Sequence, residues 1–157
     1  MTDASEPSPS PQHIAEAVRD AMLANDTVLH SLGIAVGTVG PGQAVASMTV
    51  RADMLNGFGI CHGGLVTTLA DTAFAYACNA YNELSVAAGF AVELLAASYL
   101  HDVLTAQARE QSKSGRSGVY DVEVRNQRGE RVALFRGRSH TLKGRPVIGG
   151  RPMTRRD

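Results

Sequence analysis

The sequence predicts an α+β fold in which several strands gather around one buried helix. Residues 65–77 are rich in Ala and Leu and apolar on nearly every face, which is typical of a buried helix. Extended, strand-like runs precede and follow this segment. They do not alternate with helices, as they would in an α/β protein, so the α+β class is favoured.

The composition is that of a single globular domain. The chain has 157 residues, of which 44% are hydrophobic and 19% charged, so it can bury a core without disulfides. Cys61 and Cys78 lack the spacing of a disulfide framework and predict free thiols in the cytoplasm. Residues 1–12 do not have the pattern of a signal peptide, and glycines interrupt the uncharged stretch 54–70, so no membrane segment is expected.

The basic C-terminal third suggests an anionic partner. Residues 1–108 contain 2 Lys or Arg and 10 Asp or Glu, whereas residues 109–157 contain 13 and 5. One interpretation is a basic rim for phosphate groups, and the other is ordinary charge balance on a solvated surface. No nucleic-acid-binding motif accompanies the arginines, so a nucleic-acid partner is not expected.

The N-terminal half predicts a tail, a helix and a hairpin before the buried helix. Residues 1–12 are rich in Ser and Pro and are expected to be a disordered tail. Apolar residues recur at helical spacing over 14–24, which predicts a short amphipathic helix. The runs 32–39 and 44–50 flank a Gly-Pro-Gly turn and predict a β-hairpin. A glycine-rich loop, residues 54–64, then leads into the helix.

Four further strands are predicted after the helix, as a meander over residues 84–97, 103–108, 119–124 and 131–139. The first run is long and largely uncharged, which favours a central strand. Residues 144–157, rich in Gly, Pro and Arg, are expected to be a flexible basic tail. The folded domain is therefore expected to span residues 13–143.

Asp71 is the residue that the helix pattern does not explain. It is the only charged residue between Met54 and Tyr81. An unpaired buried carboxylate costs free energy, and burial would raise its pKa, which suits a general base. Two structural alternatives remain open: Asp71 lies on a narrow exposed stripe, or it caps a second helix that starts at Thr72.

Gly63 and Gly64 open the predicted helix. A helix N-terminus presents free N–H groups that can polarise a carbonyl and hold an oxyanion, although two glycines can also serve only as a turn. Asp71 lies eight residues after Gly63, about 12 Å along a helix axis. One carbonyl cannot touch both groups of a straight helix, so either the helix bends or Asp71 acts across a dimer interface.

Two polar residues precede the helix. His62 can bind a substrate carbonyl or anchor the loop, and Asn56 can do the same or form a turn before Gly57. Cys61 and His62 are adjacent, so their side chains diverge and a Cys/His nucleophilic dyad is not predicted. The chain has no G-x-S-x-G elbow, and its five histidines lack metal-ligand spacing.

Three segments carry a family resemblance: residues 54–57 (Met-Leu-Asn-Gly), 61–64 (Cys-His-Gly-Gly) and 69–79 (Leu-Ala-Asp-Thr-Ala-Phe-Ala-Tyr-Ala-Cys-Asn). Together with residues 118–124 and 132–140, they closely resemble the PaaI group of hotdog-fold thioesterases from phenylacetate degradation. The resemblance implies an antiparallel sheet wrapped around a long central helix. It also implies homodimers with shared active sites, usually paired into homotetramers. The implied reaction is hydrolysis of phenylacetyl-CoA or hydroxylated relatives without metal or cofactor, coenzyme A being part of the substrate.

The resemblance also assigns roles to individual residues. Asp71 matches the catalytic carboxylate, Gly63 the carbonyl-polarising N–H, and His62 and Asn56 the supporting polar groups. We expect further substrate contacts from Gly64, Thr68, Thr72, Arg116 and Arg138, the two arginines meeting the CoA phosphates. Two other functions stay open on the same fold: an acyl-CoA hydratase or dehydratase that uses His62 with Asp71, and a non-catalytic acyl-CoA-binding module.

This sequence departs from the family pattern after the third strand. The family often has an Arg-Pro-Gly-like turn there, and this chain has residues 96–102 instead. Some hotdog thioesterases place a hydroxyl on that strand to hold water, whereas Ala87, Ala88 and Gly89 offer none and Ser85 is the nearest. The acyl preference and the position of the water therefore do not follow from the resemblance.

Overall fold

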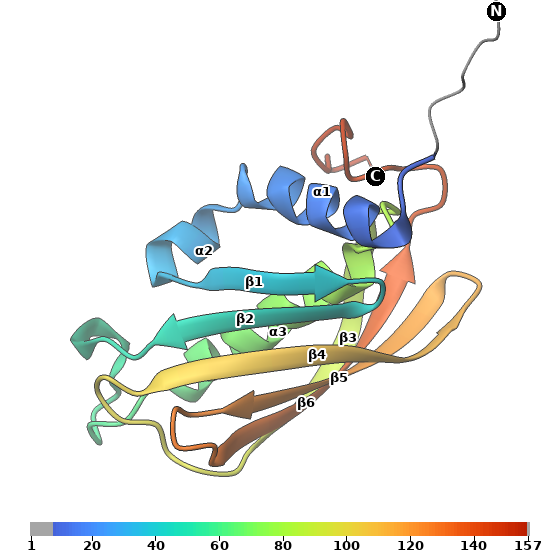
Figure 1. The fold of residues 1–157 in the computed structure, drawn as a ribbon. Coiled ribbons are helices and arrows are strands. Elements are labelled where there is room, and N and C mark those ends of the chain that lie inside the picture. The colour runs from blue at the N-terminus through green and yellow to red at the C-terminus, as the bar shows by residue number, and fades with distance from the viewer. Residues whose placement is uncertain (1–7, 157) are drawn as a thin grey trace, which may run out of the picture.

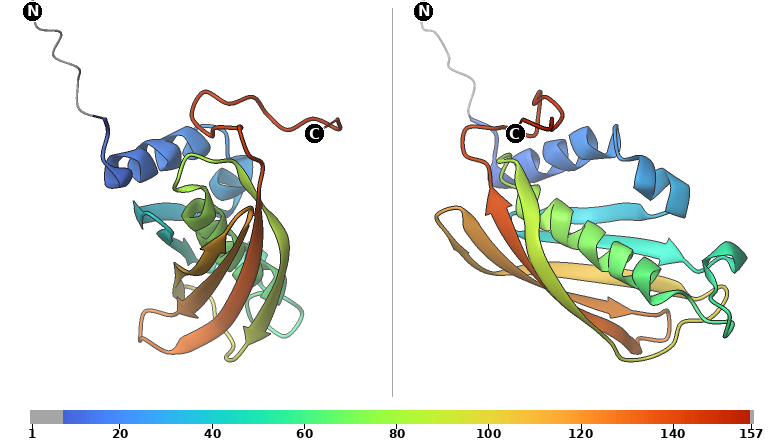
Figure 2. Two further views of the ribbon diagram at one scale, coloured as in Figure 1. Left: turned by 90° about the vertical axis from the view of Figure 1, so that its right-hand side faces the viewer. Right: turned by 180° about the vertical axis from the view of Figure 1, so that it is seen from behind.

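The computed structural model describes residues 8–156, which form one antiparallel sheet wrapped around a central helix (Figures 1 and 2). The elements in chain order are α1 (Pro11–Leu23), α2 (Thr27–Leu32), β1 (Ala35–Gly40), β2 (Gln43–Thr49), the 3-10 helix η1 (Ala52–Met54), α3 (Gly63–Asn79), β3 (Ser85–Leu94), β4 (Val103–Ser114), β5 (Ser117–Arg125) and β6 (Arg131–Thr141). The strand order is β1-β2-β4-β5-β6-β3. This architecture confirms the predicted α+β class and the hotdog fold.

Helix α3 fills the inside of the curved sheet. Leu69, Ala70, Ala73 and Ala77 have no exposed surface, because alanine lets the strands approach closely and leucine fills the remaining space. Phe74 packs against the rings of Tyr120 and Phe135, with centroids 5.5 Å and 5.7 Å away. Burial of one such aromatic ring stabilises the fold by about 1.5–3 kcal/mol.

Gly137 on β6 is needed for this packing. A Cβ atom at Gly137 would lie 3.0 Å from the Phe74 ring and 2.9 Å from the Phe135 ring. The missing side chain therefore leaves the space that the Phe74 ring occupies.

The predicted order of the last four strands is wrong. β4, β5 and β6 form a meander, but β3 pairs with β6 rather than with β4. Consequently β3 lies at the edge of the sheet, not at its centre. Its middle residues 87–91 are exposed although apolar. The uncharged run that suggested a central strand therefore does not reflect burial on both faces within this chain.

The first half contains a helix that was not predicted, α2. Helix α2 begins within a segment without a predicted element and ends at Leu32, the first residue of a predicted strand. Asp26 caps its start by accepting a hydrogen bond from the Leu29 N–H, and Gly33, at φ 65°, ends it. Strand β1 therefore starts only at Ala35.

The start of α1 and the segment after β6 lie on the side of the molecule where α3 ends (Figure 1). Helix α1 begins at Pro11, inside the segment 1–12 predicted as a tail, of which residues 1–7 lie outside the described residues. Residues 144–156 contain neither helix nor strand. Asn82 Oδ1 accepts hydrogen bonds from the Val147 and Ile148 N–H groups at 3.0 Å and 2.9 Å, which fix the start of this segment. No helix within residues 8–156 has the length and hydropathy to cross a bilayer.

Candidate active site

The groove nearest the predicted site lies at the N-terminal end of α3. Its volume is about 330 Å³, and its lining comes from the glycine-rich loop, the first turns of α3 and the chain that leaves β3: Asn56, Ile60, Cys61, Gly63, Val66, Leu94, Leu95, Ala96, Ala97 and Ser98. The Cys61 N–H donates to the Ser98 carbonyl at 2.8 Å, which joins two of these segments. The groove is mostly apolar, as expected for a site that binds an acyl group.

Asn56 shapes the loop beside this groove. Its Oδ1 accepts hydrogen bonds from the Phe58 N–H at 2.9 Å and the Ile60 N–H at 3.4 Å. The predicted turn role of Asn56 is therefore confirmed, and its side-chain oxygen is engaged within the loop. The turn leaves the Phe58 ring 91% exposed at the loop tip.

His62 is the N-cap of α3. Its Nδ1 accepts a hydrogen bond from the Gly64 N–H at 3.1 Å, and its carbonyl accepts from the Leu65 N–H at 2.9 Å. The anchoring role is thus confirmed, and in the neutral ring the proton lies on Nε2. Gly64, expected to bind substrate, has its N–H engaged by this cap.

The Gly63 N–H is left without an acceptor at the start of the helix. No hydrogen bond among residues 8–156 uses it. It lines the groove and lies at the positive end of the helix dipole, where a carbonyl oxygen that gains negative charge is stabilised. Gly63 is also closely approached, because a Cβ atom there would lie 2.5 Å from Leu94 Cδ1.

Asp71 lies in the middle of α3 and is partly exposed in the single chain. The helix runs unbroken from Gly63 to Asn79, so the alternative that Asp71 caps a second helix is wrong. Among the described residues its carboxylate has no hydrogen bond or ion pair, and partial burial raises the pKa of Asp71. An unpaired carboxylate of raised pKa is suited to accept a proton.

Asp71 shares one side of α3 with Gly64, Thr68 and Ala75, which all keep some exposed surface. Their spacing of three or four residues places them on one face of the helix. The Thr68 hydroxyl donates to the Gly64 carbonyl at 2.9 Å, so it can only accept a hydrogen bond from a ligand. Thr72, also expected to bind substrate, is buried, and its hydroxyl donates to the Thr68 carbonyl at 2.8 Å.

Arg116 and Arg138 lie away from the groove within one chain. Arg116 is exposed in the turn between β4 and β5. Arg138 is exposed between the buried residues Gly137 and Ser139, which places its side chain on the outer face of the sheet. Neither arginine is part of the groove lining, so the chain alone does not bring them to Asp71 or Gly63.

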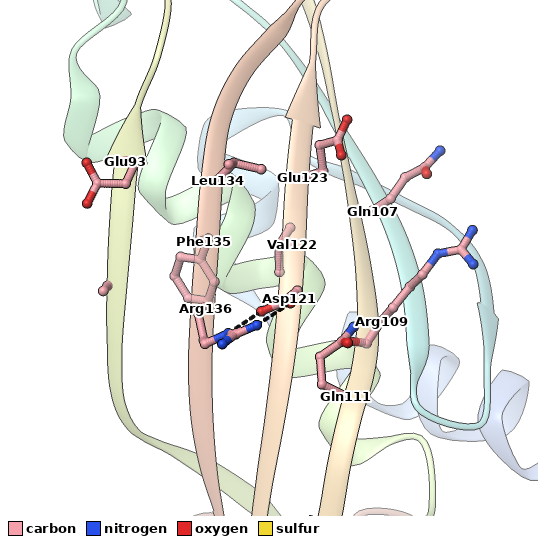
Figure 3. Close-up of a pocket in the computed structure, with 11 residues that line it drawn as sticks. Glu93, Gln107, Arg109, Gln111, Asp121, Val122, Glu123, Leu134, Phe135 and Arg136 are labelled. Carbon is pink, nitrogen blue, oxygen red and sulfur yellow. Dashed lines mark hydrogen bonds and ion pairs between the residues drawn. The ribbon is translucent and has the colours of Figure 1, made fainter.

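A larger hollow of about 440 Å³ lies on the outer face of the sheet, over β3 to β6 (Figure 3). It contains none of the predicted site residues. Its central charges pair with each other, because Arg136 donates two hydrogen bonds to Asp121 at 2.6 Å and 2.7 Å and lowers the pKa of that carboxyl. We therefore place the candidate active site at the smaller groove, where the Gly63 N–H has no acceptor among the described residues. Asp71 is not part of the groove lining of its own chain.

The groove holds one thiol, that of Cys61. Burial raises the pKa of this thiol, so it is not an activated nucleophile. Within residues 8–156, no group of three His, Cys, Asp or Glu side chains is arranged to hold a metal ion. The reactive groups that the groove and α3 offer are the Gly63 N–H and the Asp71 carboxylate.

Sequence reasoning did not propose most of the groove lining, and Leu94 and Ser98 are two examples. Leu94 belongs to an apolar run that gives no sign of a site. Ser98 is 2% exposed, and its hydroxyl has no hydrogen-bond partner among the described residues. The nearest signal was the departure from the family pattern over residues 96–102.

Residues 58–133 match the family model of the thioesterase superfamily. The acyl-coenzyme A thioesterase PaaI of Escherichia coli strain K12 is 46% identical over 124 residues, which cover 79% of this chain and 89% of that protein.

Solved structures are similar over most of the chain. The structure of E. coli PaaI, described as a protein from the phenylacetic acid degradation operon, superposes with a TM-score of 0.84 and 44% identity, and covers 86% of this chain and 98% of that one. A hypothetical thioesterase from Streptococcus pneumoniae TIGR4, solved with coenzyme A, has a TM-score of 0.66 and 25% identity, covering 69% of this chain and 87% of that one.

Proposed function

Because this chain belongs to the thioesterase superfamily, we propose that it hydrolyses acyl-CoA thioesters to the free acid and CoA, with phenylacetyl-CoA or hydroxylated phenylacetyl-CoA as its substrate class. The acyl preference is supported by the similarity to PaaI of E. coli, whose structure is described as coming from a phenylacetic acid degradation operon. Coenzyme A enters as part of the substrate, and the reaction needs no other cofactor. The cytoplasm is the compartment expected for this activity.

The observation that carries the proposal is the pair of unpaired groups on α3. The Gly63 N–H polarises the thioester carbonyl and stabilises the oxyanion that forms on attack. The Asp71 carboxylate either takes a proton from the attacking water or attacks the carbonyl itself. His62 keeps the Gly64 N–H occupied and holds the loop, and Asn56 keeps the turn beside the groove in place.

The two groups act from different subunits of a homodimer. Asp71 follows Gly63 by eight positions in the unbroken helix, which is about 12 Å along the axis and too far for one carbonyl. Two features of the single chain support a second copy. The edge strand β3 has free backbone groups, and it exposes apolar side chains that include Phe90, Leu94 and neighbouring Leu95. We infer shared active sites at this edge, with dimers paired into homotetramers.

The CoA phosphates require positive charge near the groove opening. Arg116 and Arg138 are exposed and basic, and neither lies at the groove of its own chain. We therefore assign them to a groove that another subunit forms. Thr68 and Gly64 lie on the exposed face of α3, along which the substrate reaches Asp71 of the partner chain.

The test is release of CoA thiol by the purified protein from aryl, aroyl and aliphatic acyl-CoAs. Thioester hydrolysis predicts a free thiol for each substrate turned over, with the highest kcat/KM for the phenylacetyl class. A hydratase or dehydratase would change the acyl group without releasing thiol, and a binding module would bind acyl-CoA without turnover. Either result would contradict the proposal.

A further inference from the structure

We propose that the side chain of Leu94 is the wall that limits the size of the acyl group in the groove. The proposal rests on the thioesterase function above and adds a specificity-determining residue to that site. Leu94 is the last residue of β3, and it lines the groove beside Gly63.

The position of Leu94 is defined by its contact with Gly63. A Cβ atom at Gly63 would lie 2.5 Å from Leu94 Cδ1, so the isobutyl group packs against the bare Cα of the glycine. The same glycine carries the N–H without an acceptor. An acyl carbonyl bound to that N–H therefore places the first carbons of its acyl group next to the Leu94 side chain.

The Leu94 side chain is also available to contact a ligand, because it does not pack into the core. It is 53% exposed and does not belong to the buried core cluster. After Leu95, the groove lining continues with the small side chains of Ala96, Ala97 and Ser98. Shortening Leu94 thus adds its volume to a stretch of the groove that is already lined by small residues.

The expected size of the effect follows from the chemistry of apolar pockets. One methylene group in such a pocket changes kcat/KM by about tenfold or more between two substrates. Replacing the isobutyl group of Leu94 by methyl removes more than one carbon from the wall. A larger residue, such as Phe, fills the space that a bulky acyl group needs.

The experiment compares Leu94→Ala and Leu94→Phe with the wild type on two pairs of substrates: butyryl-CoA with octanoyl-CoA, and phenylacetyl-CoA with 4-phenylbutanoyl-CoA. For Leu94→Ala the ratio of kcat/KM, large to small substrate, is expected to rise about tenfold in both pairs. For Leu94→Phe the ratio is expected to fall below that of the wild type. Leu100→Ala is the matched control, since Leu100 is also an exposed leucine, at 41%, and lies outside the groove.

The outcomes separate this proposal from the function on which it rests. If the wild type releases no thiol from any of the four substrates, the thioesterase function itself fails. If the wild type is active but Leu94→Ala keeps the wild-type ratios, the role of Leu94 is overturned. The same holds if Leu100→Ala shifts the ratios equally. Because Leu94 also lies on the β3 edge assigned to the dimer contact, a thermal melt and size-exclusion chromatography of each variant confirm that folded protein of the wild-type oligomeric state is compared.

Discussion

The Nδ1 atom of His62 accepts a hydrogen bond from the Gly64 N–H at 3.1 Å. This cap decides which donor of the first helical turn remains available to a ligand. The Leu65 and Val66 N–H groups donate to the His62 carbonyl, so the Gly63 N–H remains without an acceptor within residues 8–156.

Replacing Gly63 by Pro should abolish most of the hydrolysis and spare the fold. Gly63 is the first residue of α3, where Pro is well tolerated, and His62 has ψ 128°, which suits the residue before a Pro. The substitution removes the unpaired N–H and adds a ring whose Cβ atom meets the flexible end of Leu94. Loss of one oxyanion donor lowers kcat by about 100- to 1000-fold. The measurement is kcat for phenylacetyl-CoA by thiol release.

Gly63→Ala is the matched control for this variant. Its Cβ atom meets the same flexible end of Leu94, but the N–H is kept. A Pro variant as active as the Ala variant would remove the Gly63 N–H from the mechanism.

Asp71→Asn should lower kcat by about 100- to 10,000-fold, as expected for loss of a general base. In the wild type, desolvation raises the pKa of Asp71. The carboxylate is then protonated and inactive below a pKa that exceeds the usual value of about 4. The profile of kcat/KM against pH should therefore fall on its acid side above pH 4. The fall should have no counterpart in the residual activity of Asp71→Asn.

The Asp71→Asn substitution should lower activity but should not lower the free energy of unfolding. A carboxyl whose pKa is raised in the folded state contributes stability at low pH that is lost as the pH rises through the folded pKa. At pH 7 the charged Asp71 therefore opposes folding, and the neutral Asn variant should unfold at an equal or higher urea concentration. A clear loss of stability at pH 7 would mean that Asp71 has a structural partner.

Co-expression of Asp71→Asn with Gly63→Pro should restore activity, although each variant alone is nearly inactive. In a mixed dimer with shared sites, one site combines the intact Gly63 of the Asp71→Asn chain with the intact Asp71 of the Gly63→Pro chain. The other site combines the two substituted residues and is inactive. Random pairing makes half of the dimers mixed, so about a quarter of wild-type activity should return. The pair Asp71→Asn with Asp71→Ala is the control and should stay inactive. If each site belongs to one chain, neither combination will recover.

Ser98→Ala should not destabilise the protein. The Ser98 hydroxyl is buried without a hydrogen-bond partner in the described structure, and burial of an unpaired polar group costs about 1–3 kcal/mol. Its removal is therefore expected to leave the free energy of unfolding unchanged or raise it by up to about 1 kcal/mol. The backbone bond from the Cys61 N–H is kept.

Ser85→Ala is the contrasting variant, measured by urea unfolding under the same conditions. The Ser85 hydroxyl is buried and contacts Thr141 Oγ1 at 2.8 Å and the Glu83 carbonyl at 3.2 Å. Its loss should lower the free energy of unfolding by about 1 kcal/mol. Equal effects at Ser98 and Ser85 would show that the Ser98 hydroxyl does have a partner.

Much of this architecture could be predicted because its signals are local. The Ala-rich pattern of α3 and the glycine pair at its start are visible in sequence, and the structure places both as expected. Helix α2 was missed because its six residues are too few to show a helical period, although Asp26 and Gly33 mark its ends. Asp71 was noticed for its chemistry, since a lone charge in an apolar helix needs an explanation.

The rest depends on pairing between distant segments, which no local pattern encodes. The run 84–97 has the composition of a strand buried on both faces, yet residues 87–91 of β3 are exposed in the single chain. An apolar strand covered by a second copy and one covered by its own chain have the same composition. Likewise, the outward direction of Arg138 depends on the register of β6, and the contact of Leu94 with Gly63 joins residues 31 positions apart.

The position of β3 also orders the events of folding. Its strand partner within the described chain is β6, whose residues 131–141 are synthesised long after residues 85–94. During translation β3 has no strand partner until β6 is synthesised, whereas α3 and the hairpin of β1 and β2 can already associate. The contact of Leu94 with Gly63 at the start of α3 is therefore made by a strand that has no strand partner until β6 is complete. A nascent chain stalled before residue 131 would hold every candidate catalytic residue without the enclosure they need.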